Sequence, residues 1–255
     1  MRSLIAVGLS AFLLASCASM PMSGRGPDTA ANAAAVADTA RPEADRARDA
    51  DRKPAAMLDF AGVKPGMVVV DFWPGGGYFT RILSRAVGPE GRVYSLAPEE
   101  TKQFGQRALD GVDKLNADPA TPNVKASFVP AARFAAPEAV DLVFTAQNYH
   151  DLHEKFMGPA DVPAFNKAVF AALKPGGVFL VIDHDAAPGA GPESLELHRI
   201  DPEIVKREVT AAGFVFEGEL DVLKNPADPR TANVFDKSIR GHTSQFVYKF
   251  RKPKH

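Results

Sequence analysis

The sequence predicts an α/β fold, in which helices cover both faces of a doubly wound, mostly parallel sheet of seven strands with an antiparallel last strand. Short apolar runs alternate with segments of helical periodicity, which is typical of a parallel sheet wrapped on both faces. A glycine-rich loop follows the first run. The chain ends on two strand-like segments without a helical pattern between them, which favours seven strands over the six of a dinucleotide-binding sheet.

The first part of this domain is expected to form helix, strand, helix and strand. Pro54 occupies a favourable first-turn position for a helix that the Lys64-Pro65-Gly66 turn ends. Residues 67–72 form an apolar run typical of a strand buried on both faces. The pattern then predicts a helix over 78–87 and, after a Gly-Pro turn, a strand over 92–96.

The middle part continues the alternation. Residues 99–116 place apolar side chains on one helical stripe. Apolar runs predict strands over 124–129 and 140–146, and the segment between them is too short for a long helix. A helix capped by Asp161 follows, and 178–182 is the fifth predicted strand.

The last part supplies one helix and two strands. Pro202 to Ala212 is predicted as a helix that Gly213 ends. Residues 214–223 and 245–251 alternate in part between apolar and polar side chains, which predicts the final two strands.

The first 17 residues are expected to be a bacterial lipoprotein signal peptide and its lipobox. A positive Arg2 precedes an apolar run over 4–15, which is shorter than the roughly 20 residues needed to cross a bilayer. Leu14-Ala15-Ser16-Cys17 resembles a lipobox, which implies a lipid anchor on Cys17. We expect a lipid-anchored protein on the periplasmic face of the cell envelope, with the outer membrane favoured because Ala18 follows the cysteine. The alternative is an ordinary signal peptide.

Composition divides the remainder into a tether and one domain. Residues 18–53 are rich in Ala, Pro, Asp and Arg, and are expected to be a flexible tether, while 54–255 suit a single domain. Because Cys17 is the only cysteine, the domain has no disulfide, cysteine metal site or thiol nucleophile. The formal net charge is −1 and no basic stripe is present, which argues against nucleic acid as a partner.

The loop after the first strand is the strongest functional signal. Gly75, Gly76 and Gly77 follow Pro74, and glycine allows a ligand to approach the backbone closely at the start of a helix. The nicotinamide fingerprint G-x-G-x-x-G fails because Thr80 occupies its third glycine position, so a nicotinamide oxidoreductase is disfavoured.

An acidic residue closing the strand and a Pro-Gly-x-Gly loop resemble the first motif of class I S-adenosylmethionine-dependent methyltransferases. The resemblance implies the Rossmann-like methyltransferase fold, S-adenosylmethionine as cofactor, and cofactor contacts at Asp71, Gly75 and Gly77, with Pro74 and Gly76 shaping the turn. Common members have a glycine where this chain has Trp73.

Further stretches resemble a group of predicted methyltransferases found as exported bacterial envelope proteins. They are Leu173–Val178, Asn148–His153, His198–Asp201 and segments between Asn225 and Thr243. The chain departs from the wider superfamily at the end of the second strand, where an acidic residue normally binds the ribose. Either Glu99, just beyond that strand, reaches back to replace it, or ribose binding is weaker.

The chemistry is expected at the polar cluster after the fourth strand. His150 is the preferred general base, with Asp151 as an alternative base or orienting group and Asn148 beside them. Trp73, Tyr78 and Tyr149 are candidates to face the sulfonium. No spacing demands a metal ion, so none is predicted, although histidines and carboxylates between residues 150 and 198 offer ligands.

The predicted function is methyl transfer to an unidentified acceptor, expected to be a small molecule. S-adenosylmethionine is made in the cytosol, so export favours a second hypothesis. In that alternative the domain is a catalytically degenerate methyltransferase fold that binds a small molecule or a partner at the cell envelope.

Overall fold

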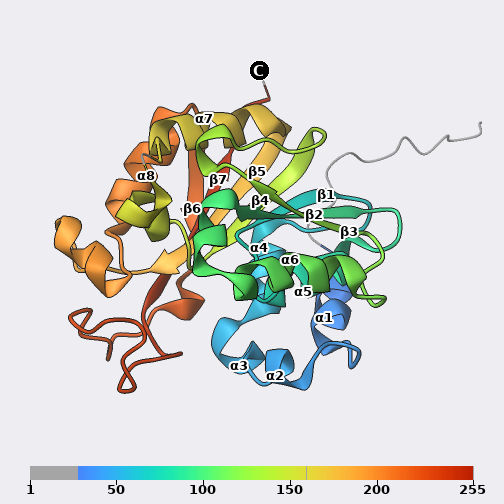
Figure 1. Cartoon of the computed structure of the whole chain (residues 1–255), viewed down its shortest axis with the longest axis horizontal. Helices are drawn as coiled ribbons and strands as arrows, with labels where there is room; N and C mark the ends of the chain where they lie inside the picture. The colour runs from blue at the N-terminus through green and yellow to red at the C-terminus, as the bar shows by residue number, and fades with distance from the viewer. Residues whose placement is uncertain (1–27, 159, 255) are drawn as a thin grey trace, which may run out of the picture.

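A computed structural model describes residues 28–158 and 160–254 (Figure 1). The predicted signal peptide, the lipobox and Cys17 lie outside the described residues. Within the described part of the chain, no helix combines the length and apolarity needed to cross a membrane.

The seven strands form one sheet in the order β3-β2-β1-β4-β5-β7-β6. The strand β7 runs antiparallel to both of its neighbours, and the remaining pairs are parallel, as predicted. The strands are β1 Val68–Phe72, β2 Arg92–Pro98, β3 Val124–Val129, β4 Val140–Ala146, β5 Leu173–His184, β6 Val215–Glu219 and β7 Gln245–Arg251.

Helices cover both faces of the sheet (Figure 1). The α-helices are α1 Thr29–Ala37, α2 Glu43–Arg46, α3 Asp49–Arg52, α4 Pro54–Ala61, α5 Tyr78–Val87, α6 Gln106–Ala117, α7 Val162–Ala172 and α8 Pro202–Ala211. The 3-10 helices are η1 Glu99–Phe104, η2 Ala131–Arg133, η3 His150–His153, η4 Lys155–Met157, η5 Pro192–Leu197 and η6 Asp221–Leu223.

The hydrophobic core consists of one cluster on each face of the sheet. On one face, Val70 and Phe72 of β1 pack with Phe165 of α7 and with residues of α8. On the other face, Val69 packs with Ile82 of α5 and with residues of α1 and α4. Alternate residues of β1 thus point into different clusters, which explains why its sequence is apolar without interruption.

Most predicted boundaries are confirmed within a few residues. The predicted helix over 99–116 is divided at Gly105, whose φ of 79° ends η1 before α6 begins. The fifth strand starts at Leu173 rather than at 178, because Val140 pairs with Leu173 before a shift in register. The sixth strand ends at Glu219, and η6 follows.

The described part of the predicted flexible tether is folded. Residues 29–52 form α1, α2 and α3, in which Asn32 and Ala35 are buried. Arg41 makes a two-pronged ion pair with Asp49. The segment is held by ion pairs and a few small buried side chains, which composition alone does not reveal. The folded domain therefore includes residues 28–53, and the boundary predicted at residue 54 lies too late.

Candidate functional site

The carboxyl ends of the parallel strands meet at one edge of the sheet, where a ligand site is expected in an open α/β fold. A cleft of about 420 Å³, called the first cleft, lies at this edge. It is lined by residues within 45–52, 73–78, 146–156 and 234–235, together with Phe104, His184 and His198.

The glycine loop forms one wall of the first cleft. Trp73, Gly75 and Gly77 all have positive φ, at 62°, 55° and 82°. The value at Trp73 is strained, since a bulky side chain adopts the left-handed region only at a cost that glycine does not incur. The amide of Trp73 donates to the carbonyl of Leu96 at 2.8 Å, which holds the loop against β2.

A second cleft of about 500 Å³ continues on the other side of the glycine loop. Both clefts are lined by Trp73, Pro74, Gly75, Gly76 and Phe104. The second cleft extends along η1 and α6, where its charged lining residues are the basic Arg81, Arg107 and Lys114. No carboxylate is among its lining residues in the described chain.

The predicted cofactor residues divide into two groups. Pro74, Gly75 and Gly76 line both clefts, so a ligand in either one meets them. Asp71 and Gly77 line neither cleft. A side chain at position 77 would also place its Cβ 2.5 Å from Leu115 Cδ2, so this glycine is required by packing.

Asp71 lies beneath the loop rather than facing a ligand. Its carboxylate accepts a hydrogen bond from the hydroxyl of Thr80 at 2.5 Å. Burial raises the pKa of Asp71 to about 6, although the Thr80 hydroxyl and the charge of Arg52 oppose that rise. Asp71 thus ties the end of β1 to the first turn of α5.

Glu99 points away from both clefts. Its carboxylate pairs with Lys102 at 3.0 Å on the surface. The carboxylate of the neighbouring Glu100 accepts a hydrogen bond from the backbone amide of Ala131, so it stabilises the fold at the end of β3. The structure therefore brings neither carboxylate into the second cleft, and a role of Glu99 in ribose binding stays a prediction.

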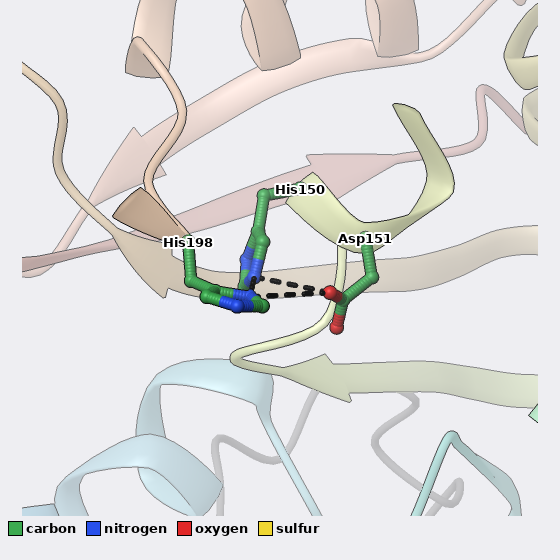
Figure 2. A group of neighbouring side chains, drawn as sticks. All are labelled: His150, Asp151 and His198. Atoms are coloured by element: carbon green, nitrogen blue, oxygen red, sulfur yellow. Dashed lines mark hydrogen bonds and ion pairs between the residues drawn. The ribbon is translucent and has the colours of Figure 1, made fainter. Parts of the chain in front are cut away.

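His150 lies at the floor of the first cleft, at the start of η3, and is 2% exposed. Its Nδ1 lies 2.8 Å from Asp183 Oδ1, and its backbone amide donates to Asp183 Oδ2 at 2.7 Å. Its Nε2 lies 3.3 Å from Asp151 Oδ1 and 3.2 Å from His198 Nδ1 (Figure 2). Asp183, at the end of β5, therefore orients the ring, and Asp151 contacts its other nitrogen.

The electrostatics of this cluster disfavour His150 as a neutral base. Burial by itself lowers the pKa of His150, but the charge of Asp183 and hydrogen bonds with Asp151 and Asp183 raise it to about 10. Burial raises the pKa of Asp151, but hydrogen bonds with His150 and His198 lower it overall. The raised pKa of His150 and the lowered pKa of Asp151 together favour an imidazolium paired with a carboxylate.

Asn148 has a positioning role in the structure. Its side-chain amide donates to the carbonyl of Trp73 at 3.0 Å and to that of Ala146 at 2.7 Å. These bonds join the end of β4 to the glycine loop. Both amide protons are thereby used, which leaves only the side-chain oxygen of Asn148 for a ligand.

Tyr149, a candidate to face the sulfonium, and the nearby His153 both face away from the first cleft. His153 pairs with Glu208 of α8, with 3.2 Å between Nε2 and Oε2. The buried Tyr149 donates to the same carboxylate at 3.0 Å. Neither lines the first cleft, whereas Trp73 and Tyr78 do.

One wall of the first cleft was not among the residues predicted from the sequence. Asp45, Arg48 and Arg52 reach it from α2, α3 and the turn between them. The guanidinium of Arg52 lies 4.5 Å from the ring centre of Tyr78 and donates to Gln147 at 3.0 Å. The spacing of acids and arginines by three or four residues between 41 and 52 is a helical signal that could have identified this wall.

Comparisons with known proteins agree with this fold. The sequence profile of the protein-L-isoaspartate(D-aspartate) O-methyltransferase family (PCMT) matches residues 42–131, which is less than half of the chain. No curated protein matches the chain in sequence.

Similar solved structures cover most of the chain. A SAM dependent methyltransferase from Aquifex aeolicus is 20% identical with a TM-score of 0.54, over 80% of this chain and 98% of that one. One from Mesorhizobium loti is 18% identical with a TM-score of 0.53, over 80% and 99%. The cyclase SpnF is 18% identical with a TM-score of 0.57, over 86% and 85%. The chain therefore has the Rossmann-like methyltransferase fold.

The raised pKa of Asp71 predicts a pH-dependent stability. The pKa of Asp71 is about 6 in the folded protein, against an ordinary 3.8. Its contribution to the free energy of unfolding is therefore largest at low pH, where the carboxyl is protonated, and is lost as pH rises through 6. We expect Asp71→Asn to raise the free energy of unfolding above pH 7 by up to about 3 kcal/mol, with the gain vanishing below about pH 4. Urea unfolding at several pH values measures this.

The matched control is Asp113→Asn, which alters an exposed carboxylate on α6. Its stability profile should parallel that of the wild type. A constant difference between Asp71→Asn and the wild type across this pH range would refute the assignment.

Proposed function

We propose that this protein is an S-adenosylmethionine-dependent methyltransferase acting on a small-molecule acceptor in the first cleft. The observation that carries the proposal is the open backbone at residues 74–76, which lines two adjoining clefts at the carboxyl edge of the sheet. The matching family profile and the methyltransferase neighbours support S-adenosylmethionine as the cofactor.

In this proposal the cofactor lies across the glycine loop. Its nucleoside occupies the second cleft, and its sulfonium faces the first cleft near Trp73 and Tyr78, because aromatic faces attract a sulfonium cation. Methyl transfer is a direct displacement, so the main task of the protein is to align the acceptor atom with the methyl group.

The first cleft offers an acceptor both apolar and polar surfaces. Phe104 and Phe235 line it with 58% and 59% of their surface exposed, and Phe156 packs against Phe104 with 5.2 Å between ring centres. The polar groups His150 and Asp151 lie on another wall. This combination supports a small organic acceptor with an apolar body and a nucleophilic oxygen or nitrogen.

The second candidate function is binding without methyl transfer. It is favoured by the lack of a carboxylate among the described residues that line the second cleft, since such a group normally holds the ribose hydroxyls. In this alternative the same clefts hold a small molecule at the cell envelope. Cofactor binding without any methyl transfer would favour it.

We further propose that the protein is anchored to a bacterial envelope membrane through a lipid on Cys17, on the periplasmic side and at the outer membrane. The support is the apolar run followed by Leu14-Ala15-Ser16-Cys17. The anchor would hold the domain at the membrane surface.

Ligand binding at the loop is the direct test of the cofactor. We expect S-adenosylmethionine and S-adenosylhomocysteine, but not NAD, to raise the melting temperature of the full chain. Gly76→Leu should abolish this shift with little change in the unliganded melting temperature, because a Cβ at position 76 meets open space beside both clefts.

Gly77→Ala is the comparison variant. It should lower the unliganded melting temperature, since position 77 has a φ of 82° and its Cβ would overlap Leu115. A Gly76→Leu protein that binds S-adenosylmethionine as tightly as the wild type would contradict the placement of the cofactor.

The polar wall is expected to act on the acceptor rather than on the cofactor. His150→Gln should lower the formation of S-adenosylhomocysteine with phenol and amine acceptors by about 10-fold or more, while cofactor affinity changes little. Calorimetry and a product assay separate the two effects. His153→Ala is the control, because His153 faces α8. Equal turnover in His150→Gln and wild type would remove His150 from the mechanism.

Cys17→Ser tests the anchor. The wild type should sediment with membranes and incorporate labelled fatty acid, whereas the variant should do neither. An unlabelled wild-type protein recovered in the soluble fraction would disprove lipidation.

A further inference from the structure

We propose that His150, Asp151 and His198 form a binding site for one divalent transition-metal ion, with Zn²⁺ the best match. The three side chains converge from η3 and from the turn that follows η5 (Figure 2). The proposal concerns metal binding and does not depend on methyl transfer. It departs from the sequence analysis, which predicts no metal.

The distances match the edges of a tetrahedral site. The Nε2 of His150 lies 3.2 Å from Nδ1 of His198 and 3.3 Å from Oδ1 of Asp151, and the last two atoms are 3.6 Å apart. A tetrahedral Zn²⁺ ion with bonds of about 2.0–2.1 Å separates its ligand atoms by about 3.3–3.4 Å. An octahedral ion with such bonds requires about 2.9 Å. The spacing of the three atoms is therefore compatible with one tetrahedral ion, which would displace the proton from Nε2 of His150 on binding.

The donor set favours a transition metal over the common hard cations. Two imidazole nitrogens and one carboxylate oxygen suit Zn²⁺ and similar ions, whereas Mg²⁺ and Ca²⁺ prefer oxygen ligands. Both histidines and Asp151 line the first cleft, so a fourth position is open to water or a ligand. Three protein ligands with one open position are typical of catalytic rather than structural zinc.

Asp183 orients the first ligand. It is fully buried and accepts hydrogen bonds from the ring nitrogen Nδ1 and the backbone amide of His150. The other ring nitrogen is thereby left to face Asp151 and His198. A carboxylate behind the histidine is the usual arrangement at metal sites, where it fixes the tautomer and strengthens the ligand.

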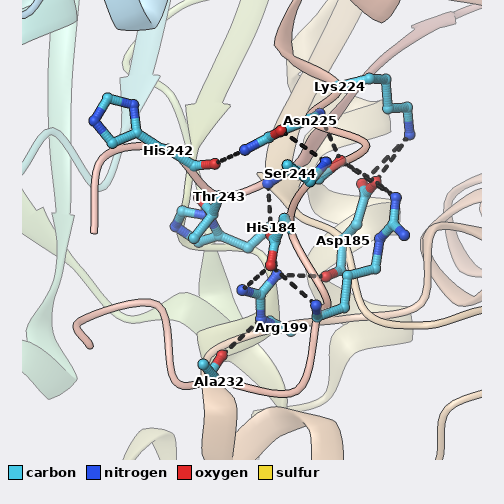
Figure 3. Close-up of polar contacts among 12 residues, drawn as sticks. His184, Asp185, Arg199, Lys224, Asn225, Ala232, His242, Thr243 and Ser244 are labelled. Carbon is cyan, nitrogen blue, oxygen red and sulfur yellow. Dashed lines mark hydrogen bonds and ion pairs between the residues drawn. The ribbon is translucent and has the colours of Figure 1, made fainter. Parts of the chain in front are cut away.

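A buried ion pair next in sequence holds His198. Arg199 and Asp228 are both 0% exposed in their side chains and lie 2.8 Å apart. Arg199 also donates to the carbonyls of Asp185 and Ala232 (Figure 3). His198 itself has a φ of 55°, in the left-handed region that residues other than glycine seldom adopt. Strain that is held in place by such a network is typical of functional sites.

The competing explanation is a metal-free cluster in which the three groups share protons. That cluster needs only hydrogen bonds, so Zn²⁺ would bind no better to it than to exposed histidines. The two explanations therefore differ in the affinity and stoichiometry of metal binding.

The experiment uses the full chain in detergent, stripped of metal with a chelator and titrated with ZnCl₂ by calorimetry. We expect one Zn²⁺ per chain and a higher melting temperature. His198→Ala and Asp151→Asn should each weaken this binding by about 100-fold or more, and Asp183→Asn by about 10-fold to 100-fold. Co²⁺ in the same site should show the intense visible absorption of tetrahedral coordination.

His242→Ala is the matched control, because His242 is 68% exposed in its side chain. It should bind Zn²⁺ as tightly as the wild type. Circular dichroism verifies that each variant is folded. If His198→Ala does not fold, His198→Gln replaces it. Absence of stoichiometric binding in the wild type, or equal affinity in the folded His198 and Asp151 variants, would overturn the proposal.

Discussion

The parallel pairing of β1 with β4 is the constraint on which the site depends. In the sheet, β2 and β4 lie on opposite sides of β1. The loop that follows β1 therefore lies at the point where the strand order reverses direction. This pairing brings the glycine loop beside the residues that follow β4. The amide of Asn148 completes the connection by donating to the carbonyl of Trp73. The two clefts then share the backbone of one loop.

Buried charge is concentrated around this edge of the sheet. Asp71 and Asp183 end or nearly end their strands and are almost fully buried. Arg199 pairs with Asp228 in the interior. Removing one member of such a pair costs about 3–5 kcal/mol, whereas replacing both by apolar groups is often harmless. Stability alone therefore does not explain why these charged groups are buried. Their positions explain it, because each group holds a residue of the first cleft or of the glycine loop in place.

The fold by itself does not decide the reaction. Two of the similar structures are methyltransferases by name and another is a cyclase, so one architecture supports different chemistries. The open glycine loop and the adjoining clefts support methyl transfer. Three converging side chains and the groups that orient them support metal binding. Both proposals involve His150 and Asp151, but cofactor binding at the glycine loop and Zn²⁺ binding are measured separately, so one can fail without the other.

The sequence by itself determined the order of strands and helices, the open loop at residues 74–76 and the position of His150 shortly after β4. These features depend on local periodicity and on glycine and proline, whose effects act within a few residues. The composition of residues 28–53 pointed to a tether because those residues are polar. Their folding depends on ion pairs within the segment and on burial against α5. Neither feature produces a periodic pattern of apolar residues that could be read from the sequence.

Only the tertiary structure decided which polar residues meet. His153 lies three residues after His150 and faces α8, while His198 lies 48 residues away in sequence and meets His150 directly. Likewise, Glu99 directly follows β2, where a carboxylate for the ribose was expected, but its side chain pairs with Lys102 at the surface. Such contacts depend on how loops return to the sheet edge, because the conformation of one segment carries no information about a partner that arrives from a distant one.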